Sequence, residues 1–163
     1  MIDWILSPAR LGGAAALLAG YGVLCAGVAR RLWRERQAER RERQDLQAGP
    51  KDGPHVLVAY ASQTGQAEAL ARESARVLHA GGCAVRLLPV QALALADLQA
   101  CSHSVWVLST TGEGDAPDHA QPFVRQVLER AAALPGHMAQ VLALGDREYA
   151  QFCAFGLRVQ QWL

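Results

Sequence analysis

The stretch Ser62-Gln63-Thr64-Gly65-Gln66-Ala67 decides the fold of this chain. It directly follows the apolar run 56–61 and directly precedes a helical pattern of apolar residues. A strand, a loop with hydroxyl groups and a helix N-terminus form an anion site, because the first-turn N–H groups lack acceptors and the helix dipole favours negative charge. The loop has no Lys or Arg, so it lacks the lysine of a nucleotide-triphosphate loop. It therefore predicts a site for one phosphate monoester, held by amides and hydroxyls without a metal.

The region from residue 55 onward alternates apolar strands with amphipathic helices. The patterns predict strands over 56–61, 84–90, 105–110 and 138–144, and helices over 67–78, 93–100, 123–131 and 155–163. Gly81 and Gly82 are expected to end the first of these helices, and Trp106 to lie in the core. The alternation predicts an α/β fold with a doubly wound parallel sheet, whose ligand lies beyond the carboxyl ends of the strands.

The N-terminal part of the chain predicts a membrane anchor. After a flank of residues 1–10, residues 11–29 contain no charged side chain and would span about 28 Å as a helix, close to the thickness of a bilayer core. Arginines are frequent after this run and only Arg10 precedes it, which predicts a single-pass anchor in a bacterial inner membrane, with lipid contacts and a cytoplasmic C-terminal domain. The alternative is a buried apolar helix.

Residues 30–54 are expected to form a charged helical stalk and a Gly/Pro linker, with the globular domain over 55–163. The acidic residues between the arginines, and the net charge of +1, argue against nucleic-acid binding. The four cysteines are widely spaced, so no metal site is predicted from them.

Three unusual segments follow predicted strands: 62–67, 109–117 and 144–153. Because the strands are parallel, these loops are expected at one edge of the sheet, where they form a single cleft. The first suits a phosphate, the second is rich in glycine and lets the backbone approach a flat ring, and the third carries Tyr149, which can stack on that ring.

These segments carry a resemblance to a known family. The motifs S-Q-T-G-x-A, [ST]-T-x-G-E-G-[DE] and L-G-[DN]-x-x-Y-x-x-F occur in order at 62–67, 109–115 and 144–152. The chain resembles the FMN-binding, flavodoxin-like domain of the diflavin reductases, which include the sulfite reductase flavoprotein subunit and the membrane-anchored NADPH–cytochrome reductases. The resemblance covers residues 55–163 and implies FMN as the cofactor.

The resemblance also implies roles for individual residues. The FMN phosphate would be held by Ser62, Gln63, Thr64, Gly65, Gln66 and Ala67. One side of the isoalloxazine would be lined by Ser109, Thr110, Thr111 and Gly112. The other side would be lined by Leu144, Gly145, Asp146, Arg147, Glu148, Tyr149, Ala150, Gln151, Phe152 and Cys153, with Tyr149 stacked on the ring. Thr111 stands where the cytochrome reductases often have an aromatic residue, so a second stacking ring is not expected. No catalytic side chain is assigned.

The family's sheet normally has a fifth strand and a final helix, and this sequence reaches about four of the five strands. The fourth strand is then expected to be an exposed edge, with Trp162 and Leu163 lacking an obvious partner. The resemblance implies electron transfer from an FAD/NADPH reductase module, in the same or a separate chain, to a haem or iron–sulfur acceptor. The alternatives are a non-redox scaffold that keeps the fold without flavin, and a membrane-tethered hydrolase that uses 62–67 for a substrate phosphate.

Overall fold

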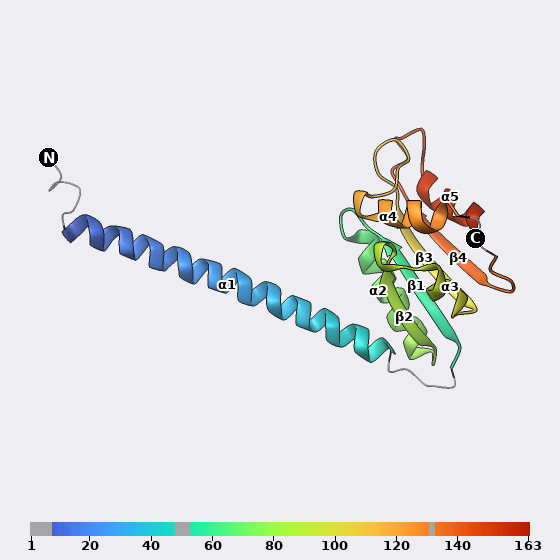
Figure 1. The fold of residues 1–163 in the computed structure, drawn as a ribbon, viewed down its shortest axis with the longest axis horizontal. Helices are drawn as coiled ribbons and strands as arrows, with labels where there is room; N and C mark the ends of the chain where they lie inside the picture. The colour runs from blue at the N-terminus through green and yellow to red at the C-terminus, as the bar shows by residue number, and fades with distance from the viewer. Residues whose placement is uncertain (1–7, 48–52, 131–132) are drawn as a thin grey trace. The chain divides into compact units, whose positions relative to one another are not determined.

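The computed structural model describes residues 8–47, 53–130 and 133–163. The chain divides into two compact units between Glu42 and Arg43. Helix α1 (Pro8–Gln47) forms the described part of the first unit and continues past its boundary to Gln47. The second contains a sheet and its covering helices (Figure 1).

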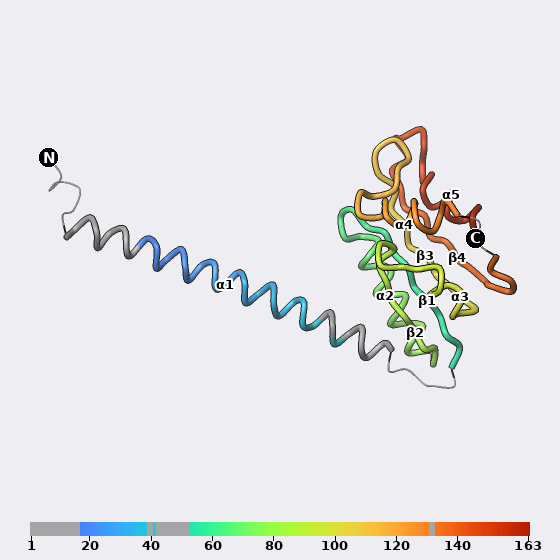
Figure 2. The backbone as a smooth tube through the Cα atoms, in the orientation of Figure 1, coloured from blue at the N-terminus to red at the C-terminus, as the bar shows by residue number. Residues whose placement is uncertain are grey.

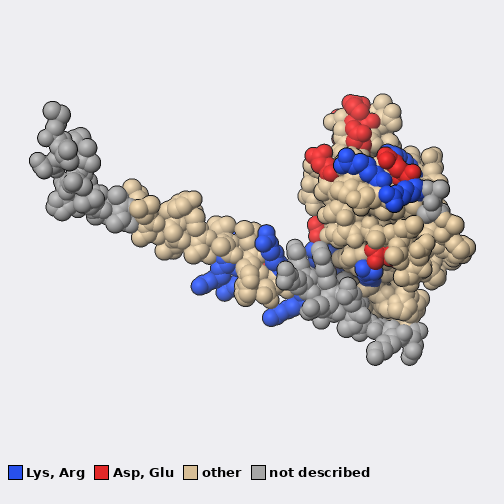
Figure 3. Space-filling view, viewed as in Figure 1, with Lys and Arg blue, Asp and Glu red and all other residues tan. Residues whose placement is uncertain are grey.

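Helix α1 includes the uncharged run 11–29 and the arginine-rich segment after it as one continuous helix. Figure 3 shows the uncharged stretch followed by Arg side chains. In the part of the chain that the structure describes, no helix has the length and apolarity needed to cross a bilayer. Residues 48–52, which make up part of the predicted linker, lie outside the described residues, as do the side chains of residues 11–16.

The sheet has four parallel strands in the order β2-β1-β3-β4. The strands are β1 (His55–Ala61), β2 (Ala84–Pro89), β3 (His103–Ser109) and β4 (Met138–Leu144). Strand β1 is paired on both sides, with Val58 opposite Leu87 of β2 and Val105 of β3. Its near-continuous burial explains why its sequence is an unbroken apolar run. The doubly wound parallel sheet predicted from the sequence is confirmed.

Alternate residues of the strands face two different helical layers. Val58, Val85 and Val107 belong to a cluster with helix α2 (Gln66–Ala80). Leu57, Trp106 and Leu108 face the other layer, which holds α3 (Leu95–Gln99), α4 (Gln121–Phe123), the π-turn η3 (Val124–Leu128) and α5 (Ala154–Trp162). The short 3-10 turns η1 (Val90–Ala92) and η2 (Asp118–Ala120) connect these elements.

Two predicted helices are shorter than the patterns indicate. The helix expected over 93–100 begins only at Leu95, because Leu93 is extended and the Asp97 carboxylate accepts a hydrogen bond from the backbone N–H of Ala94 (2.8 Å). The helix expected over 123–131 becomes α4 followed by a π-turn that ends at Leu128. In both cases local hydrogen bonds set the ends, which the apolar spacing does not encode.

Gly81 and Gly82 end α2 as predicted, with Gly82 at φ +89°. Trp106 is fully buried, as expected, and its ring packs near Phe123 with a centroid distance of 5.8 Å. The expectation that Trp162 lacks a partner is wrong. Its indole N–H donates a hydrogen bond to the carbonyl of Arg130 (2.8 Å), and its ring packs against the core cluster.

Three successive hydrogen bonds connect the buried ring of Trp106 in β3 with the loops before β4 and β3. The indole N–H of Trp106 donates to the Ser104 hydroxyl (2.8 Å), which in turn bonds Nε2 of His137 (2.7 Å). Nδ1 of His137 lies 3.0 Å from the carbonyl oxygen of Cys101. Because that carbonyl can only accept, Nδ1 of His137 carries a proton and donates it to the Cys101 carbonyl. The buried tryptophan thereby keeps its polar atom satisfied.

Candidate functional site

The loops after β1, β3 and β4 meet at one end of the sheet (Figure 2). They enclose a cleft of about 1140 Å³, lined by residues of all three loops. The lining residues are Gln63, Thr64, Gln66, Ser109, Thr110, Thr111, Gly112, Ala143, Leu144, Gly145, Asp146, Arg147, Glu148 and Phe152. The cleft lies beyond the carboxyl ends of β1, β3 and β4, where doubly wound sheets hold ligands. Residues of the three segments therefore line one cleft, as expected from the parallel strands.

The first loop connects β1 to α2. The Ser62 hydroxyl accepts a hydrogen bond from the N–H of Gly65 (3.0 Å), so this side chain shapes the loop and does not line the cleft. Gly65 precedes α2 at φ +91° and has no side-chain cap, and the first helical hydrogen bond runs from Ala69 N to Gly65 O (2.9 Å). The intervening N–H groups are therefore available to an anion at the start of α2.

The second loop is a tight hairpin built on glycine. Thr111 and Asp115 exchange two backbone hydrogen bonds (2.9 and 2.8 Å), with Gly112 at φ +50° and Gly114 at φ +114° between them. A Cβ on Gly114 would lie 2.7 Å from the Cβ of Gln151 in the third loop. The glycine thus allows the second and third loops to approach each other and close one side of the site.

The third loop folds back on the end of β4. The Asp146 carboxylate accepts a hydrogen bond from the N–H of Glu148 (3.0 Å), and the chain then turns through Cys153 at φ +58° into α5. A Cβ on Gly145 would lie 2.8 Å from the backbone nitrogen of Cys153, so both ends of this loop are in close contact. Glycine at this position is required by the packing of the loop.

One buried polar atom in the cleft has no partner among the described residues. The Thr110 hydroxyl oxygen is buried and makes no hydrogen bond, although the Thr110 backbone N–H donates to the carbonyl of Leu144 (2.8 Å). A buried hydroxyl without a partner costs about 1–3 kcal/mol. Because Thr110 also lines the cleft, a polar ligand that supplies this hydrogen bond fits the site.

The charges at the cleft come from the third loop. Arg147 is the one cationic side chain among the described lining residues, and Asp146 and Glu148 lie on either side of it. Burial raises the pKa of the neighbouring Cys153 thiol, and the positive charge of Arg147 opposes that rise. The thiol also donates a hydrogen bond to the carbonyl of Ala143 (3.3 Å). Cys153 is therefore a protonated packing residue at neutral pH and not a nucleophile.

Several residues assigned by resemblance lie outside the main cleft. Ala67 is fully buried between α2 and the sheet. Tyr149, Gln151 and Cys153 line a smaller adjoining pocket of about 90 Å³, and the Tyr149 side chain is 48% exposed. Ser62, Gly65 and Ala150 are not lining residues of either pocket. Ala143 lines the cleft but was not predicted from the sequence. It lies near the end of an apolar strand, and its methyl side chain does not distinguish a cleft residue from a core residue.

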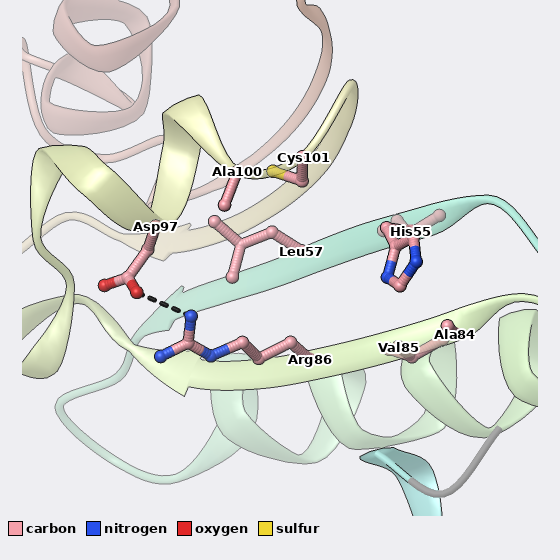
Figure 4. A pocket seen from close by; sticks show the side chains of 9 residues that line it. His55, Leu57, Ala84, Val85, Arg86, Asp97, Ala100 and Cys101 are labelled. Carbon is pink, nitrogen blue, oxygen red and sulfur yellow. Dashed lines mark hydrogen bonds and ion pairs between the residues drawn. The ribbon is translucent and has the colours of Figure 1, made fainter. Parts of the chain in front are cut away.

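A second cavity lies at the opposite, amino end of β1 and β2 (Figure 4). It has a volume of about 250 Å³, and its lining includes Leu57, Val85 and Cys101. The guanidinium of Arg86 pairs with the carboxylate of Asp97 (2.5 Å) at its rim, so the two charges offset each other. Burial raises the pKa of Cys101, which makes this thiol unreactive at neutral pH. No group of three or more metal-ligating side chains occurs within the described ranges.

The strand order and the position of the cleft define a class of protein. A parallel sheet ordered β2-β1-β3-β4, with its ligand cleft at the switch point between β1 and β3, is the arrangement of flavodoxin-like proteins. Comparison with known proteins agrees: residues 58–163 match the family described as Flavodoxin. The chain belongs to the flavodoxin family, and its globular unit is an FMN-binding domain.

Two kinds of relative are similar to this chain. A sulfite reductase [NADPH] flavoprotein alpha-component from Vibrio cholerae is 35% identical over 111 residues, which cover 66% of this chain and 18% of the relative. An NADPH–cytochrome P450 reductase from Bos taurus is 31% identical over 128 residues, which cover 76% of this chain and 19% of the relative. The chain thus spans about a fifth of the length of these curated relatives.

Solved flavodoxins share the fold. Oxidised flavodoxin 2 from Bacillus cereus superposes with a TM-score of 0.60 at 28% identity, over 67% of this chain and 73% of the flavodoxin. A mutant flavodoxin from Pseudomonas aeruginosa gives a TM-score of 0.58 at 32% identity, over 66% of this chain and 73% of the other.

Proposed function

We propose that this chain is an electron-transfer domain that receives electrons from an FAD/NADPH reductase module and delivers them to a haem or iron–sulfur acceptor. The observation that carries the proposal is the single cleft formed by the three loops, whose lining includes Gln66 at the start of α2 and Thr110, the residue with the unpartnered buried hydroxyl. The membership in the flavodoxin family supplies the cofactor, FMN. FMN supplies the electron-transfer chemistry, and the protein binds and orients it.

The first loop would hold the phosphate of FMN. Gln63, Thr64 and Gln66 line the cleft beside the start of α2, where free N–H groups and the helix dipole favour an anion. The Ser62 hydroxyl would act indirectly, because its hydrogen bond to Gly65 fixes the loop. Gly65 supplies the left-handed backbone that the loop needs, and Ala67 supplies a small side chain that lets α2 pack on the sheet.

The second and third loops would hold the isoalloxazine. Ser109, Thr110, Thr111 and Gly112 line one wall of the cleft, and residues 144–148 and Phe152 line the other. Tyr149 lines the adjoining pocket together with Thr110 and Gly112, and it would contact the ring from that pocket. The Thr110 hydroxyl would gain its missing hydrogen bond from a polar atom of the ring system.

The identity of the partners is inferred from the relatives. The curated proteins that match this chain are named as NADPH-dependent reductases, of which this chain covers about a fifth. The reductase module and the acceptor therefore remain proposals for this chain. The membrane location also stays a prediction from the sequence, supported by the uncharged run 11–29 and the arginines after it. Resistance of the full chain to alkaline extraction from membranes would test it.

The phosphate assignment is tested by charge at position 64. We expect Thr64→Asp to weaken FMN binding at least about a hundredfold, because two unit charges about 4 Å apart near a protein surface repel by about 4 kcal/mol. Thr64→Asn is the matched control, because asparagine has nearly the shape of aspartate without its charge. We expect this variant to lose much less FMN affinity. FMN fluorescence quenching on titration with the full chain measures both. Equal affinities for the two variants would contradict the assignment.

The same titration separates the proposal from the scaffold alternative. We expect the full chain, purified with its native far-UV circular dichroism, to become yellow on addition of FMN and to retain the flavin through gel filtration. A folded chain that elutes from gel filtration without flavin after incubation with excess FMN would favour the scaffold and refute the electron-transfer proposal.

A further inference from the structure

The first turn of helix α2 carries an acidic side chain, although the same turn is the proposed phosphate site. Glu68 is the third residue of α2 and the acidic residue of its first turn. The N–H groups of residues 66–68 precede the first helical hydrogen bond, from Ala69 N to Gly65 O, and have no backbone acceptor among the described residues. A carboxylate near the start of a helix is attracted to such N–H groups. Glu68 is therefore a competitor of the FMN phosphate within the chain itself.

Two side chains hold the Glu68 carboxylate by hydrogen bonds. The hydroxyl of Tyr60, on β1, donates to Oε1 of Glu68 (3.1 Å). Arg72, one turn further along α2, donates to the same oxygen from both Nε (3.2 Å) and Nη2 (2.7 Å). The carboxylate is thus bound to the sheet and to the next turn of the helix, and the N–H groups at the start of α2 are left to another anion.

The ion pair between Arg72 and Glu68 is partly buried. The side chain of Arg72 is 13% exposed and that of Glu68 is 33% exposed, and Tyr60 belongs to the buried cluster between α2 and the sheet. Solvent and salt screen such a pair less than a pair on the surface. The next pair on the same helix, Arg76 with Glu73 (3.2 Å), has both side chains more than half exposed. The exposed pair is therefore a natural control for the buried one.

The loop before α2 also keeps Glu68 from the place that a capping box would give it. In a capping box, the side chain of the third helical residue accepts a hydrogen bond from the N–H of the residue before the helix. That N–H belongs to Gly65, and it already donates to the Ser62 hydroxyl (3.0 Å). Ser62 thus occupies the N–H that Glu68 would take, while Tyr60 and Arg72 satisfy the carboxylate elsewhere.

We propose that Tyr60 and Arg72 are positioning residues of the FMN site, which keep the first turn of α2 open to the phosphate by holding Glu68 away from it. The inference rests on the proposed function, because it takes the FMN phosphate as the ligand of the first loop. The arginine also offsets the charge of the carboxylate, so the phosphate does not approach an uncompensated negative charge. Without its two partners, the Glu68 carboxylate would turn to the N–H groups and compete with the phosphate for them.

Removal of each partner tests the proposal in the full chain. We expect Arg72→Met to weaken FMN binding about tenfold, the size of a charge effect at a partly buried helix N-terminus, and Tyr60→Phe to weaken it several-fold. Riboflavin, which lacks the phosphate, is expected to lose no affinity in either variant. Arg76→Met removes the same charge from the exposed pair and is the matched control, with unchanged FMN affinity expected. Flavin fluorescence quenching measures both ligands, and far-UV circular dichroism shows that each variant is folded.

A double-mutant cycle with Glu68 separates positioning from direct attraction of the phosphate. In a Glu68→Gln background no carboxylate competes, so Arg72→Met and Tyr60→Phe are expected to change FMN affinity by less than about twofold, as independent sites do. Glu68→Gln alone is expected to bind FMN at least as tightly as the unchanged chain. Arg72→Lys keeps a charge that can pair with Glu68, and it is expected to retain most of the affinity that Arg72→Met loses.

Two results would overturn the proposal. One is an equal loss of FMN affinity on Arg72→Met with and without Glu68→Gln, which would mean that the arginine attracts the phosphate itself or only supports the fold. The other is an Arg72→Met variant that binds FMN as tightly as the unchanged chain. Either result leaves the proposed function standing, because the unchanged chain binds FMN in both. A folded, unchanged chain that retains no FMN would instead refute the proposed function and this inference together.

Discussion

Replacement of Thr110 by Val is expected to have opposite effects on the stability of the free domain and on FMN binding. The Thr110 hydroxyl is buried without a hydrogen-bond partner, although its residue lines the cleft. An unsatisfied buried polar group costs about 1–3 kcal/mol, and valine replaces the hydroxyl by a methyl group of similar shape. We therefore expect Thr110→Val to raise the free energy of unfolding of the FMN-free chain by about 1 kcal/mol, the lower end of that range.

The same substitution is expected to weaken FMN binding. A net hydrogen bond contributes about 0.5–1.5 kcal/mol, which corresponds to an affinity loss of about twofold to tenfold. Urea unfolding followed by circular dichroism measures the first quantity, and FMN fluorescence titration measures the second. Thr110→Ser keeps the hydroxyl and is the control, with near-normal affinity expected.

A hydroxyl that already has a hydrogen-bond partner in solution and does not contact the ligand would give a less stable variant with unchanged FMN affinity, because the substitution would then remove a hydrogen bond of the free domain. That pair of results would refute the idea that Thr110 is held unsatisfied for a ligand.

Three further predictions follow from the structure. Gly114→Ala is expected to lower the free energy of unfolding by about 1–3 kcal/mol and to weaken FMN binding, because φ is +114° and the new Cβ would lie 2.7 Å from that of Gln151. Gly136→Ala is the control in the same urea titrations. Gly136 has φ +72° but open space around it, so this variant measures the cost of backbone strain without a steric clash. Ser104→Ala is expected to cost about 1–3 kcal/mol, because the buried Trp106 indole N–H loses its acceptor, whereas exposed Ser102→Ala should change the urea midpoint little. Burial raises the pKa of Cys101 and Cys153 above the ordinary 9.0, so these thiols ionise at lower pH in the unfolded chain than in the folded one. Their contribution to the free energy of unfolding is therefore fully present below about pH 9 and is lost as the pH rises further. A double Cys101→Ala, Cys153→Ala variant should lose this alkaline decline in unfolding experiments from about pH 7 to 10.5.

Much of the fold could be predicted from local sequence patterns. The apolar runs gave the four strands within two residues of their observed bounds, because strands buried on both faces exclude polar residues. Helix ends were less predictable. The ends of α3 and of the π-turn after α4 depend on individual hydrogen bonds, such as that from the Ala94 N–H to Asp97, and apolar spacing does not report them.

The candidate site, like the fold, could be predicted only in part from the sequence. The sequence by itself determined which loops meet, because parallel strands place their carboxyl ends at one edge, and the motifs at 62–67, 109–115 and 144–152 marked those loops. Only the tertiary structure decided that Tyr149 lies in an adjoining pocket and that the Thr110 hydroxyl is left without a partner. Motifs record which residues occur together along the chain, whereas burial, side-chain direction and hydrogen-bond saturation depend on neighbours that are distant in sequence. The exposure of Met138 and Leu142 on β4 is also of this second kind, since it depends on what packs against β4.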